Sequence, residues 1–144
     1  KRRILLAEDN ALNREIAAEI LRQLGAQVLT AVNGAEAVRI FRAEAPYSID
    51  VILMDMQMPE MDGCQAAAAI RRLDRPDAAG IPMIAVTANA FAEDIDRTTK
   101  AGMNDHISKP IDPSILRKTM EKLMAAWDTS RNMLRRQDDG RKGT

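Results

Sequence analysis

Five short apolar runs alternate along this chain with five segments whose apolar residues recur at helical spacing. The apolar runs predict β-strands at residues 2–7, 27–31, 49–54, 82–86 and 104–108. The segments between and after them predict helices at residues 11–24, 35–45, 66–73, 91–101 and 113–127. Strands and helices that alternate at this spacing form a parallel sheet with right-handed crossovers and helices on both faces. The alternation therefore restricts the chain to an α/β fold.

The natural arrangement of five such units is a doubly wound, flavodoxin-like (βα)5 sheet with strand order 2-1-3-4-5. In that order the first and third strands are neighbours, and the carboxyl ends of all strands share one edge of the sheet. Five residues whose side chains can take part in chemistry stand just past these ends: Glu8, Asp9, Asp55, Thr87 and Lys109. We therefore expect these five side chains to converge on one pocket.

Three of these residues, Glu8, Asp9 and Asp55, are acidic, and crowding them requires a countercharge. Two unit charges about 4 Å apart repel by roughly 4 kcal/mol at an effective dielectric constant of ~20. Lys109 supplies one positive charge, and a divalent cation would supply the remainder. A site made of oxygen ligands suits Mg²⁺, with Mn²⁺ as its usual substitute. Asp55 would then be the nucleophile toward a phosphoryl group held by the metal, Lys109 and Thr87.

Each of these residues, taken alone, also has a purely structural interpretation. An Asp or Asn before a helix is a common N-cap, and a Lys at the end of a strand is usually solvated. The prediction of a site therefore depends on the five residue types occurring together at the ends of four strands.

Length and charge exclude several other classes of protein. A chain of 144 residues fits one domain, and its formal net charge of +0 argues against a nucleic-acid binder, which needs clustered Lys and Arg. Cys64 is the only cysteine, and the sequence has no apolar stretch long enough to cross a membrane. We expect a cytoplasmic domain cut from a longer parent chain, with or without a membrane anchor. Residues 1–127 would form the domain, and the polar residues 128–144 a flexible tail.

Four blocks of sequence stand at predicted strand ends in a distinctive order and spacing. They are residues 4–10 (ILLAEDN), 53–63 (LMDMQMPEMDG), 85–90 (AVTANA) and 108–110 (SKP). Together these blocks resemble the receiver domain of two-component response regulators, over about residues 2–126. Residues 101–110 are further similar to receivers attached to hybrid sensor histidine kinases.

The resemblance implies a function in phosphorelay signal transduction. Asp55 would accept a phosphoryl group from the phosphohistidine of a histidine kinase or a histidine phosphotransfer domain. The resemblance implies two groups of site residues. Mg²⁺ would be bound by Glu8, Asp9, Asp55 and the Gln57 carbonyl. The phosphoryl oxygens would be contacted by Thr87 and Lys109. Such a domain is a phosphoacceptor switch rather than a turnover enzyme.

The resemblance also implies how the domain responds to phosphorylation. Gln57 and Asn89 would flank the attacking water and set the rate of slow self-dephosphorylation, and the Lys109–Pro110 bond is expected to be cis. Thr87 and the residue at position 106 would switch the face formed by the fourth helix, fifth strand and fifth helix. The family usually has Tyr or Phe at that position, and this chain has His106.

His106 is open to two interpretations. It is a titratable switch residue, coupled to phosphorylation in a way that varies between about pH 6 and 8 because an inward ring prefers to be neutral. Alternatively, it is a half-exposed residue without a switching role.

Two other classes use related sheets. A haloacid-dehalogenase-like phosphatase also has an Asp nucleophile and Mg²⁺, but it needs a second Asp two residues later, where this chain has Gln57. A flavodoxin-type flavin carrier needs a hydroxyl-rich loop after the first strand and aromatic rings, whereas this loop is acidic and aromatic residues make up 3% of the chain.

Overall fold

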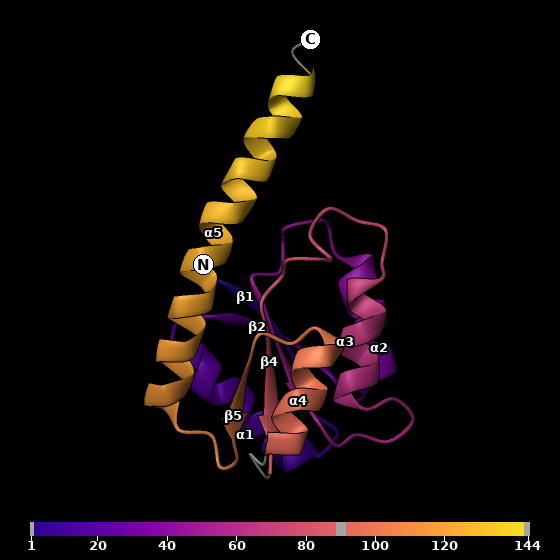
Figure 1. The fold of residues 1–144 in the computed structure, drawn as a ribbon. Coiled ribbons are helices and arrows are strands. Elements are labelled where there is room, and N and C mark those ends of the chain that lie inside the picture. The colour runs from indigo at the N-terminus through magenta and orange to yellow at the C-terminus, as the bar shows by residue number, and fades with distance from the viewer. Residues whose placement is uncertain (1, 89–91, 143–144) are drawn as a thin grey trace.

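The computed structural model describes residues 2–88 and 92–142 and contains one parallel sheet flanked by helices (Figure 1). The strands are β1 (Arg3–Ala7), β2 (Gln27–Ala31), β3 (Val51–Asp55), β4 (Met83–Thr87) and β5 (Asp105–Ser108). The helices are α1 (Ala11–Gln23), α2 (Gly34–Ala43), α3 (Gly63–Arg71), α4 (Ala92–Ala101) and α5 (Pro113–Lys142). The predicted number, order and type of elements are confirmed.

The strand order is β2-β1-β3-β4-β5, and every neighbouring pair is parallel. This confirms the predicted flavodoxin-like order. The register aligns Ala7 of β1 with Met54 of β3, and Asp55 of β3 with Val86 of β4. The carboxyl ends of the three central strands, β1, β3 and β4, are consequently level with one another.

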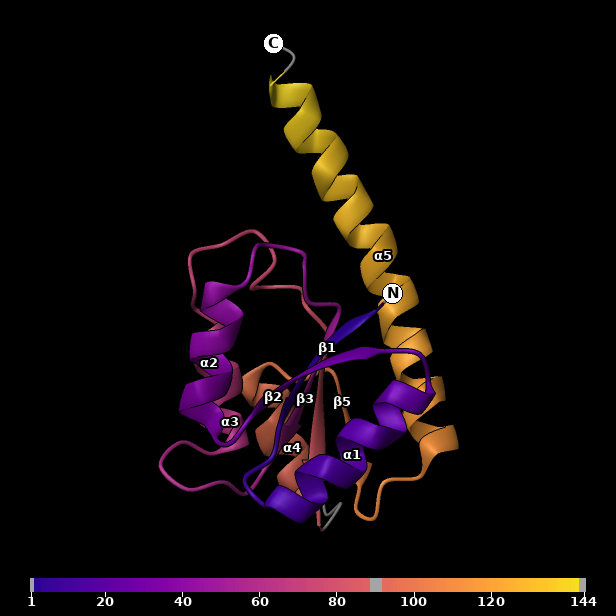
Figure 2. The same cartoon turned by 180° about the vertical axis from the view of Figure 1, so that it is seen from behind.

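Helices cover both faces of the sheet. On one face α1 and α5 pack against Ile4, Leu6, Leu53 and Ile84, and on the other α2 and α3, with the end of α4, pack against the alternate strand residues (Figures 1 and 2). Every residue of β3 and β4 is buried. Strands covered on both sides need apolar residues at successive positions, which explains why their sequences are continuous apolar runs.

Polar caps fix the starts of the helices that follow β1, β2 and β3. The side chains of Asn10, Asn33 and Asp62 each accept a hydrogen bond from a backbone N–H in the first turn. Asp62 and Gln65 form a reciprocal capping box, so α3 starts at Gly63, three residues before the predicted start at Ala66. The caps hold the loops at the carboxyl edge close to the strand ends.

The last helix differs from the prediction. The sequence predicts that it ends near Trp127, but α5 continues to Lys142 and its C-terminal part projects beyond the sheet (Figures 1 and 2). The flexibility expected of residues 128–144 stays a prediction. Contacts distant in sequence hold the first turn beyond Trp127. Asp128 accepts two hydrogen bonds from Arg2, and Arg131 donates to Asp50 at 3.2 Å. No helix in the described part of the chain is both long and apolar enough to cross a membrane.

Candidate functional site

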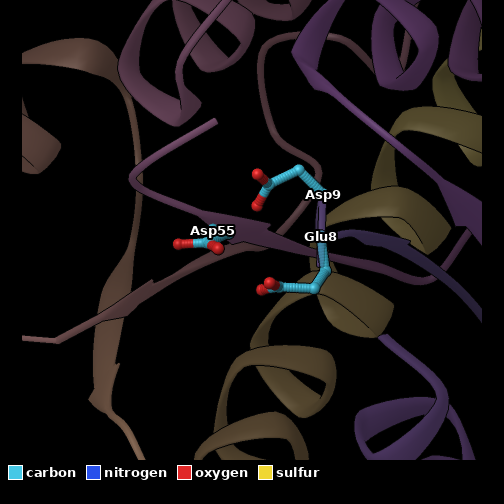
Figure 3. Close-up of side chains that lie close together, drawn as sticks. All are labelled: Glu8, Asp9 and Asp55. Carbon is cyan, nitrogen blue, oxygen red and sulfur yellow. The ribbon is translucent and has the colours of Figure 1, made fainter. Parts of the chain in front are cut away.

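Three carboxylate groups meet at the carboxyl edge of the sheet. Glu8 and Asp9 follow β1, Asp55 ends β3, and one ligand oxygen from each lies within 4.8 Å of the others (Figure 3). Glu8 and Asp55 are buried, whereas Asp9 is exposed. The expected proximity of these three residues is confirmed, and it follows from β1 and β3 being neighbours in the sheet.

Lys109 brings a positive charge to this cluster from the loop after β5. Its Nζ donates a hydrogen bond to Asp55 Oδ2 at 2.9 Å and lies 3.4 Å from Glu8 Oε2. Its backbone N–H donates to the Thr87 carbonyl at 2.8 Å, which keeps the loop beside β4. The Lys109–Pro110 peptide bond is cis, as expected.

Burial and the neighbouring charges both shift pKa values at the site. The pKa of Glu8 is raised to about 7, first by burial and then by the neighbouring Asp55 carboxylate. Burial acts to lower the pKa of Lys109, but its contacts with Asp55 and Glu8 leave that pKa raised overall. One ammonium group therefore does not neutralise the cluster, and Glu8 retains a proton more strongly than an ordinary carboxyl group.

This arrangement fits a hard divalent cation. The three ligand groups are all carboxylates, which suit Mg²⁺ better than softer metals. The raised pKa of Glu8 marks a place where added positive charge is favourable. A cation bound there would leave Asp55 next to both the metal and Lys109.

The comparison with protein families decides what kind of domain carries this site. The response regulator receiver domain matches residues 4–121. The chain belongs to this receiver family. It is therefore a receiver domain of two-component phosphorelay signalling, and the phosphatase alternative finds no support.

The curated relatives of this receiver include large hybrid kinases. It is 36% identical over 116 residues to the hybrid signal transduction histidine kinase I of Dictyostelium discoideum, an alignment that covers 79% of this chain and 7% of the relative. It is 37% identical over 117 residues to the sensor histidine kinase RcsC of Salmonella typhimurium, covering 81% and 12%. The chain thus spans about a tenth of the length of these relatives.

Solved receiver structures share the fold and, in one case, hold a metal. The receiver domain of a sensor histidine kinase from Pseudomonas aeruginosa is 35% identical, with a TM-score of 0.78, and the match covers 86% of this chain and 98% of that chain. That structure has a magnesium ion coordinated in its active-site cleft. A receiver from Syntrophus aciditrophicus is 32% identical, with a TM-score of 0.75, covering 88% and 92%.

The structure also places the other residues predicted for the receiver site. Thr87 is buried at the end of β4, level with Ser108 of β5. Gln57 is exposed in the loop after β3, and its N–H donates to Asp55 Oδ1 at 3.1 Å. Asn89 lies outside the described residues. Thr87 therefore shares the carboxyl edge with the acidic cluster, and Gln57 is joined to Asp55 through its backbone.

His106 lies within β5, opposite Ala85 of β4. Its side chain is 32% exposed, and Nδ1 lies 3.8 Å from Asp105 Oδ1. The backbone N–H of His106 donates to the same Asp105 oxygen at 2.8 Å. This half-buried position is compatible with either interpretation of the residue, so its role in switching stays a prediction.

Sequence reasoning missed Arg14, which contacts the backbone of the acidic residues. Its Nη1 donates to the carbonyl oxygens of Glu8 and Asp9. The available signal was a basic residue at the fourth position of a helix that begins shortly after an acidic pair, where the helix dipole disfavours positive charge.

Proposed function

We propose that this receiver is the phosphoacceptor of a phosphorelay and that Asp55 is the residue phosphorylated. The observation that carries the proposal is the position of the Asp55 carboxylate, which lies within 4.8 Å of the Glu8 and Asp9 ligand atoms and 2.9 Å from Lys109 Nζ. An Asp55 oxygen attacks the phosphorus atom of a phosphohistidine. The bond from phosphorus to the imidazole nitrogen breaks, and the imidazole leaves with that electron pair.

The residues of the site divide into a metal-binding group and a phosphoryl-binding group. Glu8, Asp9, Asp55 and the Gln57 carbonyl would hold Mg²⁺, with Mn²⁺ as a substitute. Bound there, the ion supplies positive charge for the phosphoryl oxygens. Lys109 and the Thr87 hydroxyl would contact those oxygens, and the magnesium ion in the Pseudomonas aeruginosa receiver supports this division.

An apolar surface beside the site suits a helical phosphodonor. Leu12 and Ile16 of α1 are 69% and 51% exposed. Ile16 also lines a cavity of about 410 Å³ that extends to Lys109, Pro110 and Ile111. An amphipathic helix of a histidine kinase or phosphotransfer domain would lay its apolar face here, with its phosphohistidine toward Asp55.

Phosphorylation would switch the face formed by α4, β5 and α5. Thr87 is joined to this face by the hydrogen bond from Lys109 N–H and by its register with β5. Movement of Thr87 toward the phosphoryl group would therefore displace β5, and the side chain of His106 would change its position. Gln57 and Asn89 would set the rate at which water removes the phosphoryl group.

The parent chain is proposed to be a hybrid sensor histidine kinase. The supporting observation is that the relatives which this receiver matches include hybrid kinases from Dictyostelium discoideum and a sensor histidine kinase from Salmonella typhimurium.

Acetyl phosphate provides a direct test, because it donates a phosphoryl group without a partner protein. The chain is incubated with acetyl phosphate and Mg²⁺, and its intact mass is measured beside that of Asp55→Asn. We expect one added phosphoryl group on the wild type, none on Asp55→Asn, and a loss of labelling when EDTA removes the metal. Equal labelling of Asp55→Asn would refute the assignment of Asp55.

A further inference from the structure

The loop between β1 and α1 must bring two consecutive acidic side chains to the same place. In an extended strand, successive side chains point to opposite faces. Glu8 and Asp9 nevertheless both place a ligand oxygen near Asp55 (Figure 3). The conformation of the backbone at these two residues therefore decides whether their carboxylates converge.

Arg14 links this backbone to the helix that follows. It is the fourth residue of α1, and its side chain returns past the start of the helix. Its Nη1 donates to the Glu8 carbonyl oxygen at 3.0 Å and to the Asp9 carbonyl oxygen at 3.4 Å. Its own backbone N–H donates to the Asn10 carbonyl at 2.8 Å, as the first hydrogen bonds of a helix do. Both acidic residues are thus tied to one guanidinium group on a regular helix.

The start of α1 does not require this arginine. Asn10 already caps the helix, with its side chain accepting a hydrogen bond from Asn13 N–H at 2.9 Å. A positive charge near a helix N-terminus is instead unfavourable, because the helix dipole is positive at that end. The hydrogen bonds of Arg14 to the loop offset this effect, and they act on the conformation of the loop rather than on helix formation.

Building on the metal site of the proposed function, we propose that Arg14 is a positioning residue: it holds the Glu8 and Asp9 backbone in the conformation that lets both carboxylates bind one cation. Outer residues that orient metal ligands typically change metal affinity by about 10- to 100-fold when they are replaced. Arg14 acts here through two backbone carbonyls. Its hydrogen bonds favour Mg²⁺ binding, whereas its positive charge disfavours it.

The hydrogen bonds of Arg14 and its charge predict opposite effects on Mg²⁺ affinity when the residue is replaced, which makes the proposal testable. A positive charge close to an acidic site repels a cation, so removal of the Arg14 charge alone would strengthen Mg²⁺ binding. Loss of the two hydrogen bonds would let the loop relax and would weaken Mg²⁺ binding. The sign of the change in Mg²⁺ affinity therefore separates the two effects.

The experiment measures the Mg²⁺ dissociation constant of the full chain by calorimetric titration for the wild type, Arg14→Ala, Arg14→Lys and Arg22→Ala. Arg22 is a matched control on the same helix, because its ion-pair partners among the described residues are Glu15 and Glu19 of that helix, and it stands one residue before the end of α1, away from the loop. Urea unfolding without metal shows whether each variant remains folded. Amide chemical shifts of Glu8, Asp9 and Asn10 in the metal-free proteins report the loop directly.

We expect the dissociation constant of Arg14→Ala to rise about tenfold or more, with shifted loop amides. Arg14→Lys keeps the charge without the planar guanidinium and should recover part of the affinity, and Arg22→Ala should match the wild type. Unchanged or tighter Mg²⁺ binding by folded Arg14→Ala would overturn the positioning role while leaving the metal site intact. If Arg14→Ala does not fold, wild-type affinity in Arg14→Lys with shifted loop amides would overturn it. Failure of the wild type itself to bind Mg²⁺ would instead overturn the proposed metal site and this role with it.

Discussion

At the scale of single residues, the site shifts the pKa of Glu8. Its pKa is raised to about 7 because it is buried and lies beside Asp55. The folded metal-free protein therefore holds this proton more tightly than the unfolded chain does. The resulting contribution to stability is fully present below the ordinary pKa of about 4.5 and is lost as the pH rises through about 7.

This pKa predicts a pH dependence of folding. In EDTA, the free energy of unfolding should fall by on the order of 2–3 kcal/mol between about pH 4.5 and pH 8 on account of Glu8. Glu8→Gln cannot ionise and should remove most of that slope. Urea unfolding at several pH values measures both proteins, and the same slope in Glu8→Gln would show that another group is responsible.

Asp9 offers a second prediction, in which the sign depends on the metal. Its side chain is exposed, and in the metal-free protein it adds negative charge to Glu8 and Asp55. Asp9→Asn should raise the free energy of unfolding in EDTA by up to about 1 kcal/mol. In Mg²⁺ the order should reverse, because the wild type gains about 2.7 kcal/mol at a hundred times the dissociation constant and the variant gains less. Urea unfolding with and without Mg²⁺ tests this, and a variant less stable in both conditions would contradict it.

Most residues of the site could be predicted from the sequence, but Arg14, which holds the loop that carries Glu8 and Asp9, could not. Glu8, Asp55 and Lys109 were predictable because each stands at or just past the carboxyl end of a strand, and parallel strands place these ends together. Arg14 was not, because its partners are backbone carbonyls whose direction depends on the bend of the loop. The raised pKa of Glu8 likewise depends on burial by the finished fold.

At the scale of elements, the end of α5 shows where sequence patterns stop being informative. The strands were predictable because apolar runs reflect burial on both faces. Beyond Trp127 the residues are mostly polar, so hydrophobic periodicity indicated a tail. In the first turn beyond Trp127, Arg131 pairs with Asp50, which lies 81 positions earlier in the chain, and such long-range ion pairs leave no periodic signal.

Truncation of α5 tests how much of the helix belongs to the folded unit. Trp127 is 6% exposed and stacks on Tyr47, and Arg131 donates to the Tyr47 carbonyl. A chain ending at residue 126 should lose about 3 kcal/mol or more of unfolding free energy, as expected for removal of a buried Trp. A chain ending at residue 132 keeps these contacts and should lie within about 0.5 kcal/mol of the full chain, as is usual for changes confined to exposed residues. Equal urea stability of the two truncated chains would contradict this boundary.

At the scale of the whole molecule, the doubly wound sheet assembles the site from separate parts of the chain. The loop after β1 contributes Glu8 and Asp9, the end of β3 contributes Asp55, and the loop after β5 contributes Lys109. The same strand order places α1 beside the cavity that reaches Lys109, and it places β5 next to β4. The surface proposed for the phosphodonor and the face proposed to switch can therefore both lie next to Asp55, the proposed phosphoacceptor.

The most direct measurement is a calorimetric titration of the folded wild-type chain with Mg²⁺ at pH 8, where Glu8 is mostly ionised. The crowded carboxylates predict uptake of one Mg²⁺ per chain, with affinity strongly reduced in Asp9→Asn. Absence of Mg²⁺ uptake by the folded wild type would contradict the central claim, that these three carboxylates form a metal site which prepares Asp55 for phosphorylation.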